Sequence, residues 1–215
     1  MGVVLFLVTF YIQKPEPMRK SYTLIALLLT FSSFAQVQLG SDIDGEAAGD
    51  KSAQYGISQS SDGSIVAIGA WENDGNGTSS GHVRVYEYDT SWVQLGADID
   101  GEAAGDRSGI SVSLSSDGAI IAIGAHSNDG TASNAGHVRV YEYSLGSWSQ
   151  LGADIDGEAA YDNSGIAVSL SSDGDIVAIG AQVNAGNGAL AGHVRVYEYD
   201  TSWVQLGADI DGEAA

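Results

Sequence analysis

Carboxylates recur at fixed spacing in three copies of one acidic segment. Within each copy, Asp or Glu stands at positions 1, 3, 5 and 9, and a glycine stands at position 4. Hard oxygen ligands that alternate along a turn are how protein loops collect Ca²⁺. The alternative interpretation is that these side chains form Asx-turns that satisfy the loop backbone. The candidate Ca²⁺ ligands are Asp42, Asp44, Glu46 and Asp50; Asp98, Asp100, Glu102 and Asp106; and Asp154, Asp156, Glu158 and Asp162.

A second group of candidate residues lies where the copies differ most, directly after the shared phrase Ile-Gly-Ala. Loops on a rigid scaffold are where binding usually sits, so these positions are candidates for contacting a ligand. Neutral drift of solvated loops is the alternative explanation of the variation. The candidate ligand-binding residues are Trp71, Asn73, Asp74 and Asn76; His126, Asn128 and Asp129; and Gln182, Asn184 and Asn187.

Three histidines, His82, His137 and His193, occupy equivalent places, one in each copy. Because they stand one repeat apart, we expect that they do not converge on one metal ion, and we interpret them as structural hydrogen-bonding groups. The chain has no nucleophile elbow, Cys-His pair, phosphate loop or zinc-binding helix. The sequence therefore favours a protein that is not an enzyme. Paired acids for glycoside hydrolysis are the alternative, although no carboxylate differs from its copies.

The elements that position these residues are repeats of nearly constant length. Gln38, Gln94, Gln150 and Gln205 are 56, 56 and 55 residues apart. Each full period contains four strand-like runs, which in the second period are 110–114, 119–125, 137–143 and 148–152. Ser-Asp-Gly between the first two runs predicts a tight hairpin turn. The second run is apolar on both faces, as in a sheet packed between two neighbours.

Four short strands per period predict an all-β fold, a partial β-propeller of about three four-stranded blades. The predicted blades are residues 50–96, 106–152 and 162–207 within a repeat region of 36–215, and 36–40 form a closing outer strand. Propellers close with about four to eight blades, so the chain is predicted to be a fragment of a longer propeller. We expect the open blade edges to self-associate. Recurrent Trp and Tyr residues are assigned to packing between blades.

Strand parity places the acidic loops on a single rim. In an up-and-down blade, the loops after the second and fourth strands leave the sheet at one end, and the other loops leave at the opposite end. The acidic segments and the variable loops are therefore expected to share a face of the propeller.

Residues 1–35 have the pattern of a targeting segment. Met18-Arg19-Lys20 supplies a basic start, residues 23–31 form an apolar run, and 33–35 are a small-residue cleavage site. We predict that Met18 is the true start, that the mature protein begins at Gln36, and that it has no transmembrane span. An N-terminal membrane anchor that is retained is the alternative. The predicted location is secreted or at the cell surface.

Composition argues against several classes of partner and excludes disulfide bonds. The chain has 28 acidic and 8 basic residues, a net charge of −20 and no cysteine. Nucleic acid and anionic lipid are poor partners for so acidic a protein. Without disulfides, a secreted fold must be held by its core, its repetition or a metal.

The second repeat resembles the FG-GAP family, the repeats of integrin α-subunit propellers and their bacterial relatives. The resemblance runs from about Gln36 to the end and is carried by 105–112, 123–125 and 136–141. It implies a seven-bladed parent and extracellular recognition. Family members that bind Ca²⁺ do so between the first two strands, where this chain has only Ser-Ser-Asp-Gly. The chain departs from the motif at Tyr55-Gly56, Ser108-Gly109 and Ser164-Gly165 in place of Phe-Gly, and at Trp71, His126 and Gln182 in place of proline.

These observations predict a non-enzymatic extracellular recognition or adhesion module. We expect it to bind protein or glycan through the acidic rim loops, with Ca²⁺ as a candidate cofactor. A carbohydrate-active enzyme on a propeller scaffold is one alternative. A purely structural repeat of a larger surface protein is the other, because fold alone does not determine function.

Overall fold

A computed structural model describes residues 37–213 of the chain. The predicted targeting segment 1–35 and its alternative, a retained anchor, lie outside the described residues. The chain divides into the units Met1–Val37 and Gln38–Ala215, and the following description concerns the second unit. No helix that could cross a membrane occurs among the described residues.

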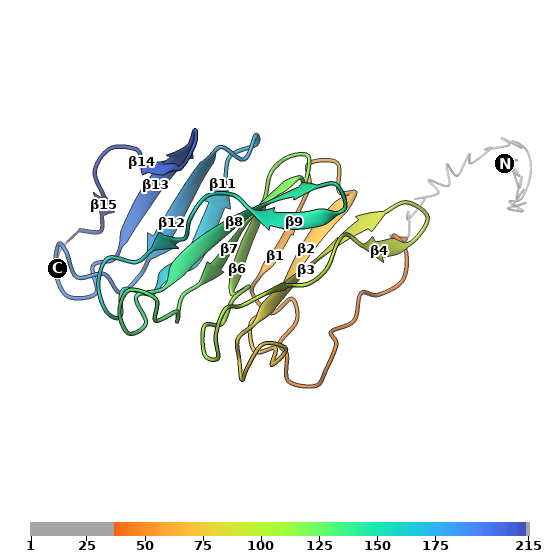
Figure 1. Cartoon of the computed structure of the whole chain (residues 1–215), viewed down its shortest axis with the longest axis horizontal. Helices are drawn as coiled ribbons and strands as arrows, with labels where there is room; N and C mark the ends of the chain where they lie inside the picture. The colour runs from red at the N-terminus through yellow and green to blue at the C-terminus, as the bar shows by residue number, and fades with distance from the viewer. Residues whose placement is uncertain (1–36, 214–215) are drawn as a thin grey trace, which may run out of the picture. The chain divides into compact units, whose positions relative to one another are not determined.

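The second unit consists of three antiparallel sheets that follow one another along the chain (Figure 1). This confirms the all-β prediction, and the strand boundaries agree with the predicted runs to within about two residues. The first sheet has β1 (Ile57–Gln59), β2 (Ile65–Ala70), β3 (His82–Tyr88), β4 (Trp92–Gln94) and β5 (Ile99–Asp100). The second has β6 (Ser111–Leu114), β7 (Ile120–Ala125), β8 (His137–Ser144), β9 (Ser147–Gln150) and β10 (Ile155–Asp156). The third has β11 (Ser164–Leu170), β12 (Ile176–Ala181), β13 (His193–Tyr199), β14 (Trp203–Gln205) and β15 (Ile210–Asp211).

The fourth strand of each sheet is divided into two pieces. In the first sheet, β4 pairs with the end of β3 and β5 pairs with its beginning. Between them, Leu95 N still donates to Val85 O at 2.7 Å, and the chain turns at Gly96 with φ of 77°. The segment that begins at Asp98, which was expected to be an inter-blade loop, is therefore partly strand. The wrong boundary has a physical reason, because Ile99 is buried against the core and holds this segment on the sheet.

The tight turns form where the sequence predicts them. Between β1 and β2, Asp62 Oδ1 accepts hydrogen bonds from Ser64 N at 2.9 Å and from Ser60 Oγ at 2.7 Å. Gly63 supplies the positive φ of 75° that this turn requires. The backbone hydrogen bond from Ser64 and the hydroxyl hydrogen bonds lower the pKa of Asp62 to about 2.

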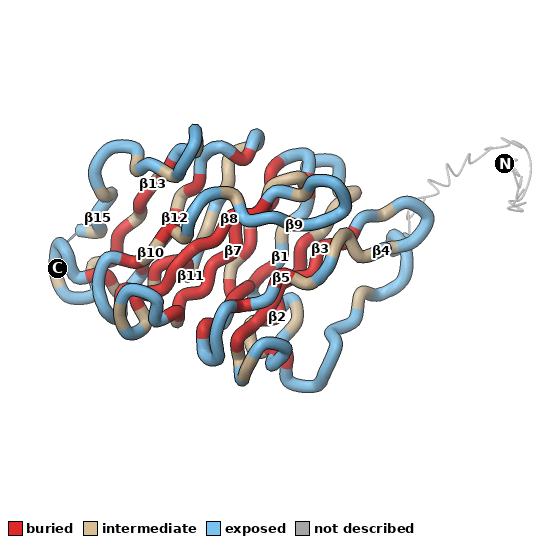
Figure 2. Tube along the Cα trace, in the orientation of Figure 1, coloured by how far each residue is buried: buried red, intermediate tan, exposed pale blue. Residues whose placement is uncertain are grey.

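The core lies between the sheets, so that the middle sheet is buried on both faces (Figure 2). Ile121 and Ile123 of β7 pack against the first sheet, and Ala122 of the same strand packs against the third. This confirms that β7 is apolar on both faces because it lies between two neighbours.

Each pair of outer strands is joined by a tryptophan. Trp148 Nε1 of β9 donates to Leu95 O of the preceding sheet at 2.8 Å, and Trp203 donates to Leu151 O in the same way. Trp92 makes the equivalent bond to Leu39 O at 2.9 Å, although no strand is assigned at 37–44. Trp148 also packs on the core between the first two sheets. The tryptophans therefore connect successive sheets, as the repeat pattern predicts.

Glycines bring the sheets into close contact. A Cβ on Gly69 or Gly124 would overlap the carbonyl oxygen of Gly109 or Gly165, respectively, in the next sheet. On the third sheet, Gly180 has Ala167 Cβ of its own sheet as its nearest neighbour, at 3.5 Å from an ideal Cβ. That face is open, and we call it the open face. It carries a groove lined by residues of β11, β12, β13 and β15 and of the loop before β13, among them Gly180, Gly192 and Ile210.

The structure corrects one alignment of the repeats. Ala53 N donates to Gly69 O, as Gly109 N donates to Gly124 O, and Ala53 has a positive φ of 58°. The counterpart of Ser108-Gly109 in the first sheet is therefore Ser52-Ala53 and not Tyr55-Gly56. The sequence comparison missed this because the first repeat has one additional residue between Ala53 and Gly56.

Candidate functional site

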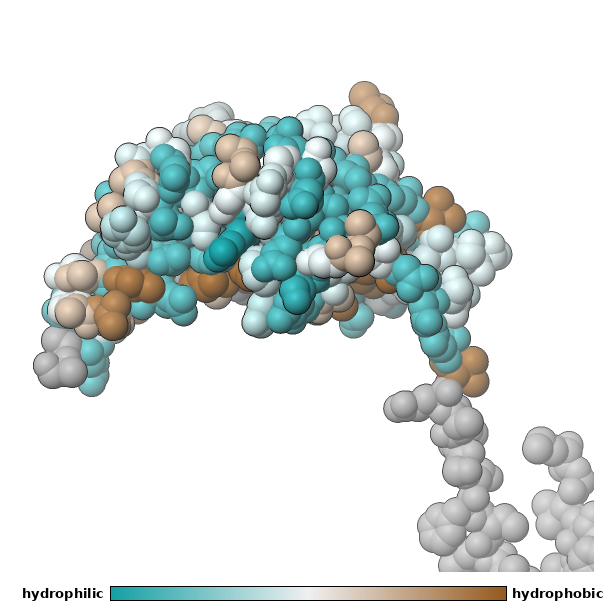
Figure 3. Space-filling model, turned by 90° about the horizontal axis from the view of Figure 1, so that it is seen from below, coloured by the Kyte–Doolittle hydropathy of each residue, from teal (hydrophilic) through white to brown (hydrophobic). Residues whose placement is uncertain are grey.

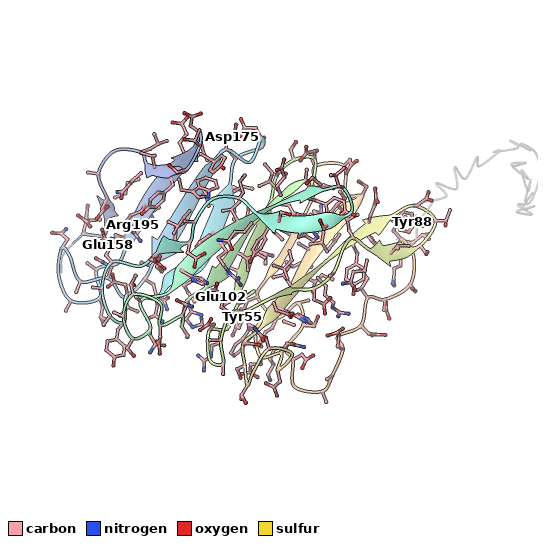
Figure 4. The ribbon with its side chains drawn as sticks, viewed as in Figure 1. Tyr55, Tyr88, Glu102, Glu158, Asp175 and Arg195 are labelled. Carbon is pink, nitrogen blue, oxygen red and sulfur yellow. The ribbon has the colours of Figure 1, made fainter. Side chains whose placement is uncertain are left out.

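The variable loops and the acidic loops meet at one end of the sheets. Asn76 Nδ2, in the loop after β2, donates to Gly101 O at 2.8 Å and to Glu102 O at 3.2 Å. Thr78 O in the same loop accepts a hydrogen bond from Gly105 N at 2.9 Å. We call this end the acidic rim; it comprises loops 71–81, 126–136 and 182–192 together with loops 45–50, 101–106 and 157–162. Figure 4 shows Glu102 and Tyr55 at this end and Asp175 at the opposite end. The side of the molecule seen in Figure 3 is largely hydrophilic.

The aspartate at position 9 of each acidic segment holds its loop in shape. Asp50 is buried, and its Oδ2 accepts hydrogen bonds from Ala47 N at 3.1 Å and from Asn73 Nδ2 at 3.0 Å. Asn73 Oδ1 in turn accepts from Gly75 N at 2.7 Å. The same bonds recur in the other copies between Asp106 and Asn128 and between Asp162 and Asn184. The three aspartates predicted as Ca²⁺ ligands and the three asparagines predicted to contact a ligand therefore bond to one another and to their own loops.

Other predicted rim residues also bond within the loops. Asp74 Oδ1 accepts from Ser79 N, and Asp129 Oδ1 accepts from Asn134 N, each at 2.7 Å. Asn187 Nδ2 donates to Gly212 O at 2.9 Å. Gln182 is exposed. Asp74 and Asp129 are both exposed.

The remaining carboxylates assemble around the histidines. His82 Nδ1 lies 3.7 Å from Glu46 Oε2 and 3.8 Å from Asp98 Oδ2. The glutamate comes from the acidic loop before the sheet, the histidine from the start of the third strand, and the aspartate from the turn between the pieces of the fourth strand. We call each group a Glu-His-Asp cluster. The clusters are Glu46, His82 and Asp98; Glu102, His137 and Asp154; and Glu158, His193 and Asp209.

This assembly divides the four carboxylates that the sequence predicts to act together. Asp98 joins the cluster of His82, whereas Glu102 from the same acidic segment joins that of His137. Asp100 contributes its carbonyl oxygen to Arg139 Nη2 at 2.7 Å, and Asp44 and Asp156 do the same for Arg84 and Arg195. Burial raises the pKa of Asp156, followed by the charge of Asp154.

Each carboxylate of a cluster contacts a neighbouring Gln or Arg side chain through one oxygen, and its other oxygen faces the histidine. Gln94 Nε2 donates to Asp98 Oδ1 at 2.6 Å, which leaves Oδ2 facing His82. Arg84 Nη1 lies 3.8 Å from Glu46 Oε1, and Oε2 faces His82. The other clusters repeat this arrangement with Gln150 and Arg139, and with Gln205 and Arg195. Glu158 and Arg195 lie next to each other in Figure 4.

The histidines are almost completely enclosed. His82 and His137 are each 1% exposed, and their Nε2 atoms are buried without a hydrogen-bond partner. Burial, followed by the charge of Arg139, lowers the pKa of His137 to about 4, so this imidazole is neutral at pH 7. Burial also raises the pKa of Glu102. Sequence reasoning placed the histidines one per repeat but missed their carboxylate partners. The available signal was that His, Glu, Asp and a Gln four residues before the Asp recur together.

An aromatic group on the acidic rim breaks the repeat. The rings of Tyr55 and Trp71 are 6.2 Å apart, and Arg107 Cζ lies 5.4 Å from the centre of a Trp71 ring. Tyr55 is 62% exposed. At the next junction His126 replaces Trp71, and its backbone oxygen accepts from Asn163 at 3.4 Å. We call the first arrangement the aromatic junction.

Comparisons with known proteins show distant structural likeness only. No protein-family model matches the chain, and no curated protein matches it in sequence. A provisionally assigned 6-phosphogluconolactonase from Bacteroides uniformis is 12% identical, with a TM-score of 0.49 over 73% of this chain and 40% of its own. Hydrazine synthase from Kuenenia stuttgartiensis is 14% identical, with a TM-score of 0.48 over 84% of this chain and 42% of its own. The chain thus spans less than half of either protein, and neither likeness carries an argument about function.

The site geometry supports two kinds of chemistry. The Glu-His-Asp clusters offer one imidazole nitrogen and two carboxylate oxygens each, a set suited to ligating a cation. The aromatic junction offers the exposed ring of Tyr55 next to Trp71, whose ring faces the Arg107 guanidinium, and this group is suited to contact with another molecule.

Proposed function

We propose that residues 37–213 are part of a β-propeller and that the protein is a non-enzymatic recognition or adhesion module, secreted or held at the cell surface. The three consecutive sheets with one strand order, packed face to face, support the propeller assignment. The FG-GAP resemblance stays a prediction, as do the seven-bladed parent and the closing strand.

The aromatic junction is the observation that carries this proposal. Trp, Tyr and Arg are the residues that most often dominate the energy of protein interfaces. Here Tyr55, Trp71 and Arg107 come from three separate segments and meet on the acidic rim. Loops braced by buried Asp-Asn pairs hold them in place, which reduces the ordering that binding would require.

The partner that fits this surface is an extracellular protein or glycan. Its apolar face would pack on Tyr55, and polar or basic groups beside it would meet the carboxylates of the rim. The net charge of −20 makes nucleic acid and anionic membranes unsuitable partners. Ca²⁺ at the acidic loops stays a prediction, although the structure distributes the predicted ligands among several places.

The test is a binding screen on arrays of glycans and extracellular matrix proteins. In Trp71→Gln, the tryptophan takes the residue found at the equivalent Gln182. We expect this variant to weaken binding by about tenfold or more, the loss typical of a residue that dominates an interface. The matched control is Tyr161→Gly, which removes an exposed tyrosine and restores the residue found at Gly105.

Two results would contradict the proposal. The first is binding that is unchanged in Trp71→Gln. The second is the absence of binding on both arrays, which would favour the purely structural repeat. Turnover of a bound glycan would favour the enzyme alternative instead.

A further inference from the structure

Three potential ligand atoms converge at the centre of each Glu-His-Asp cluster. In the first cluster they are His82 Nδ1, Glu46 Oε2 and Asp98 Oδ2, and all three lie within 4.8 Å of one another. The opposite oxygens of the carboxylates face Arg84 and Gln94. No hydrogen bond joins the His82 imidazole to either carboxylate, since the shorter of the two distances is 3.7 Å and protein hydrogen bonds end near about 3.2 Å.

The imidazole of each cluster is deeply buried. The side chains of His82, His137 and His193 are each only 2% exposed. A buried imidazole is thus aimed at two carboxylate oxygens without being bonded to either.

We propose that each Glu-His-Asp cluster binds one divalent transition-metal ion of the zinc class. His Nδ1, Glu Oε2 and Asp Oδ2 are the three protein ligands, and water from the exposed side completes the set. Zinc lies about 2.0 to 2.2 Å from such atoms, so two ligands of one ion lie at most about 4.2 Å apart. The His-carboxylate separations of 3.7 to 3.9 Å satisfy this limit.

The exposure of the three ligand side chains matches what binding requires. The His82 side chain is fixed at 2% exposure, whereas the side chains of Glu46 and Asp98 are 44% and 31% exposed. The carboxylates can therefore close on an ion while the imidazole stays in place. Gln94 and Arg84 orient them from behind, as outer partners do at metal sites.

The ligand set selects the class of metal. Imidazole nitrogen suits zinc and the neighbouring transition metals, whereas Ca²⁺ takes six to eight oxygen ligands. This inference differs from the predicted Ca²⁺ loop in both the residues and the ion, and it does not depend on the recognition proposal.

The experiment is a titration of the full chain, stripped of metal by chelator, with Zn²⁺ in a calorimeter. We expect three equivalents to bind, and His137→Asn to reduce the number to two. Glu102→Gln changes a half-exposed side chain and tests the same site without disturbing the core; it should weaken one of the three sites. Co²⁺ added in place of Zn²⁺ should give a visible absorption band that falls by about one third in His137→Asn.

Asp42→Asn is the matched control. Asp42 accepts a hydrogen bond from Gln38 at 2.7 Å, as Asp98 does from Gln94, but it belongs to none of the three clusters. This variant should keep three equivalents. The proposal is overturned if His137→Asn and Glu102→Gln, both folded by circular dichroism, still bind three ions with unchanged affinity. It is also overturned if Ca²⁺ binds the clusters and Zn²⁺ does not.

Discussion

The carbonyl oxygen of Gly165 lies against Gly124 of the preceding sheet, where any Cβ on Gly124 would overlap it. We therefore predict that Gly124→Ala lowers the free energy of unfolding by about 3 kcal/mol or more, because the backbone of the next sheet must move. Chemical denaturation measures the change. The equivalent Gly180→Ala on the open face should be nearly neutral, and an equal loss in both variants would contradict the packing described.

His126 should make stability depend on pH. Burial, followed by the charge of Arg107, lowers its pKa to about 4. A lowered histidine pKa means that the unfolded chain binds the proton more readily, so this contribution to stability is complete above about pH 6.5 and is lost as the pH falls towards 4. The loss is at most about 3 kcal/mol.

His126→Gln, which introduces the residue found at Gln182, isolates this effect from the many carboxylates. The difference in unfolding free energy between the native chain and this variant should change between pH 7 and pH 4.5, with the native chain losing more. A difference that stays constant with pH would show that His126 titrates alike in the folded and unfolded chain.

The Asp106-Asn128 brace should be important for stability. Asn128→Ala removes the Nδ2 donor at 3.0 Å and leaves the buried Asp106 carboxylate short of a partner. We expect a loss of about 1 to 3 kcal/mol in thermal or chemical unfolding. Asp129→Ala, at the exposed neighbouring position, should cost less than half as much. Equal losses of unfolding free energy in the two variants would mean that the Asp106-Asn128 hydrogen bond adds no stability of its own.

The open face should promote self-association. The groove over Gly180 and Gly192 corresponds to the place that Ser108-Gly109 and Ser164-Gly165 fill at the other junctions. We expect the sedimentation coefficient to rise with protein concentration, and Gly180→Arg to abolish the rise. Thr201→Arg, an equal change of charge at an exposed turn, is the control. A compact monomer at all concentrations would contradict this prediction.

The fold could be predicted because its signals are local. The turn at Ser60 and Asp62 and the two-sided burial of Ile121 and Ala122 follow from residues that are neighbours in sequence. The site could not be predicted in the same way. Asp98 meets His82 because the fourth strand is divided, and neither residue signals this locally.

Two further differences have specific physical causes. Asn73 stands in a polar segment that looks like a solvated loop. It is nevertheless buried, because its side-chain amide donates to Asp50 and accepts from Gly75 N. Tyr55-Gly56 contains the glycine of the expected motif, but the backbone places Ala53 at that position. In both cases a hydrogen bond to a residue distant in sequence determines the role, and the local sequence pattern suggests a different one.

The tryptophan bonds between outer strands have a mechanical consequence. Because Trp148 is bonded to Leu95 O and Trp203 to Leu151 O, tension applied to one sheet passes along the outer edge to the next. The acidic loops 101–106 and 157–162 are the covalent links between the sheets, so the tryptophan bonds share that load with the backbone of these loops.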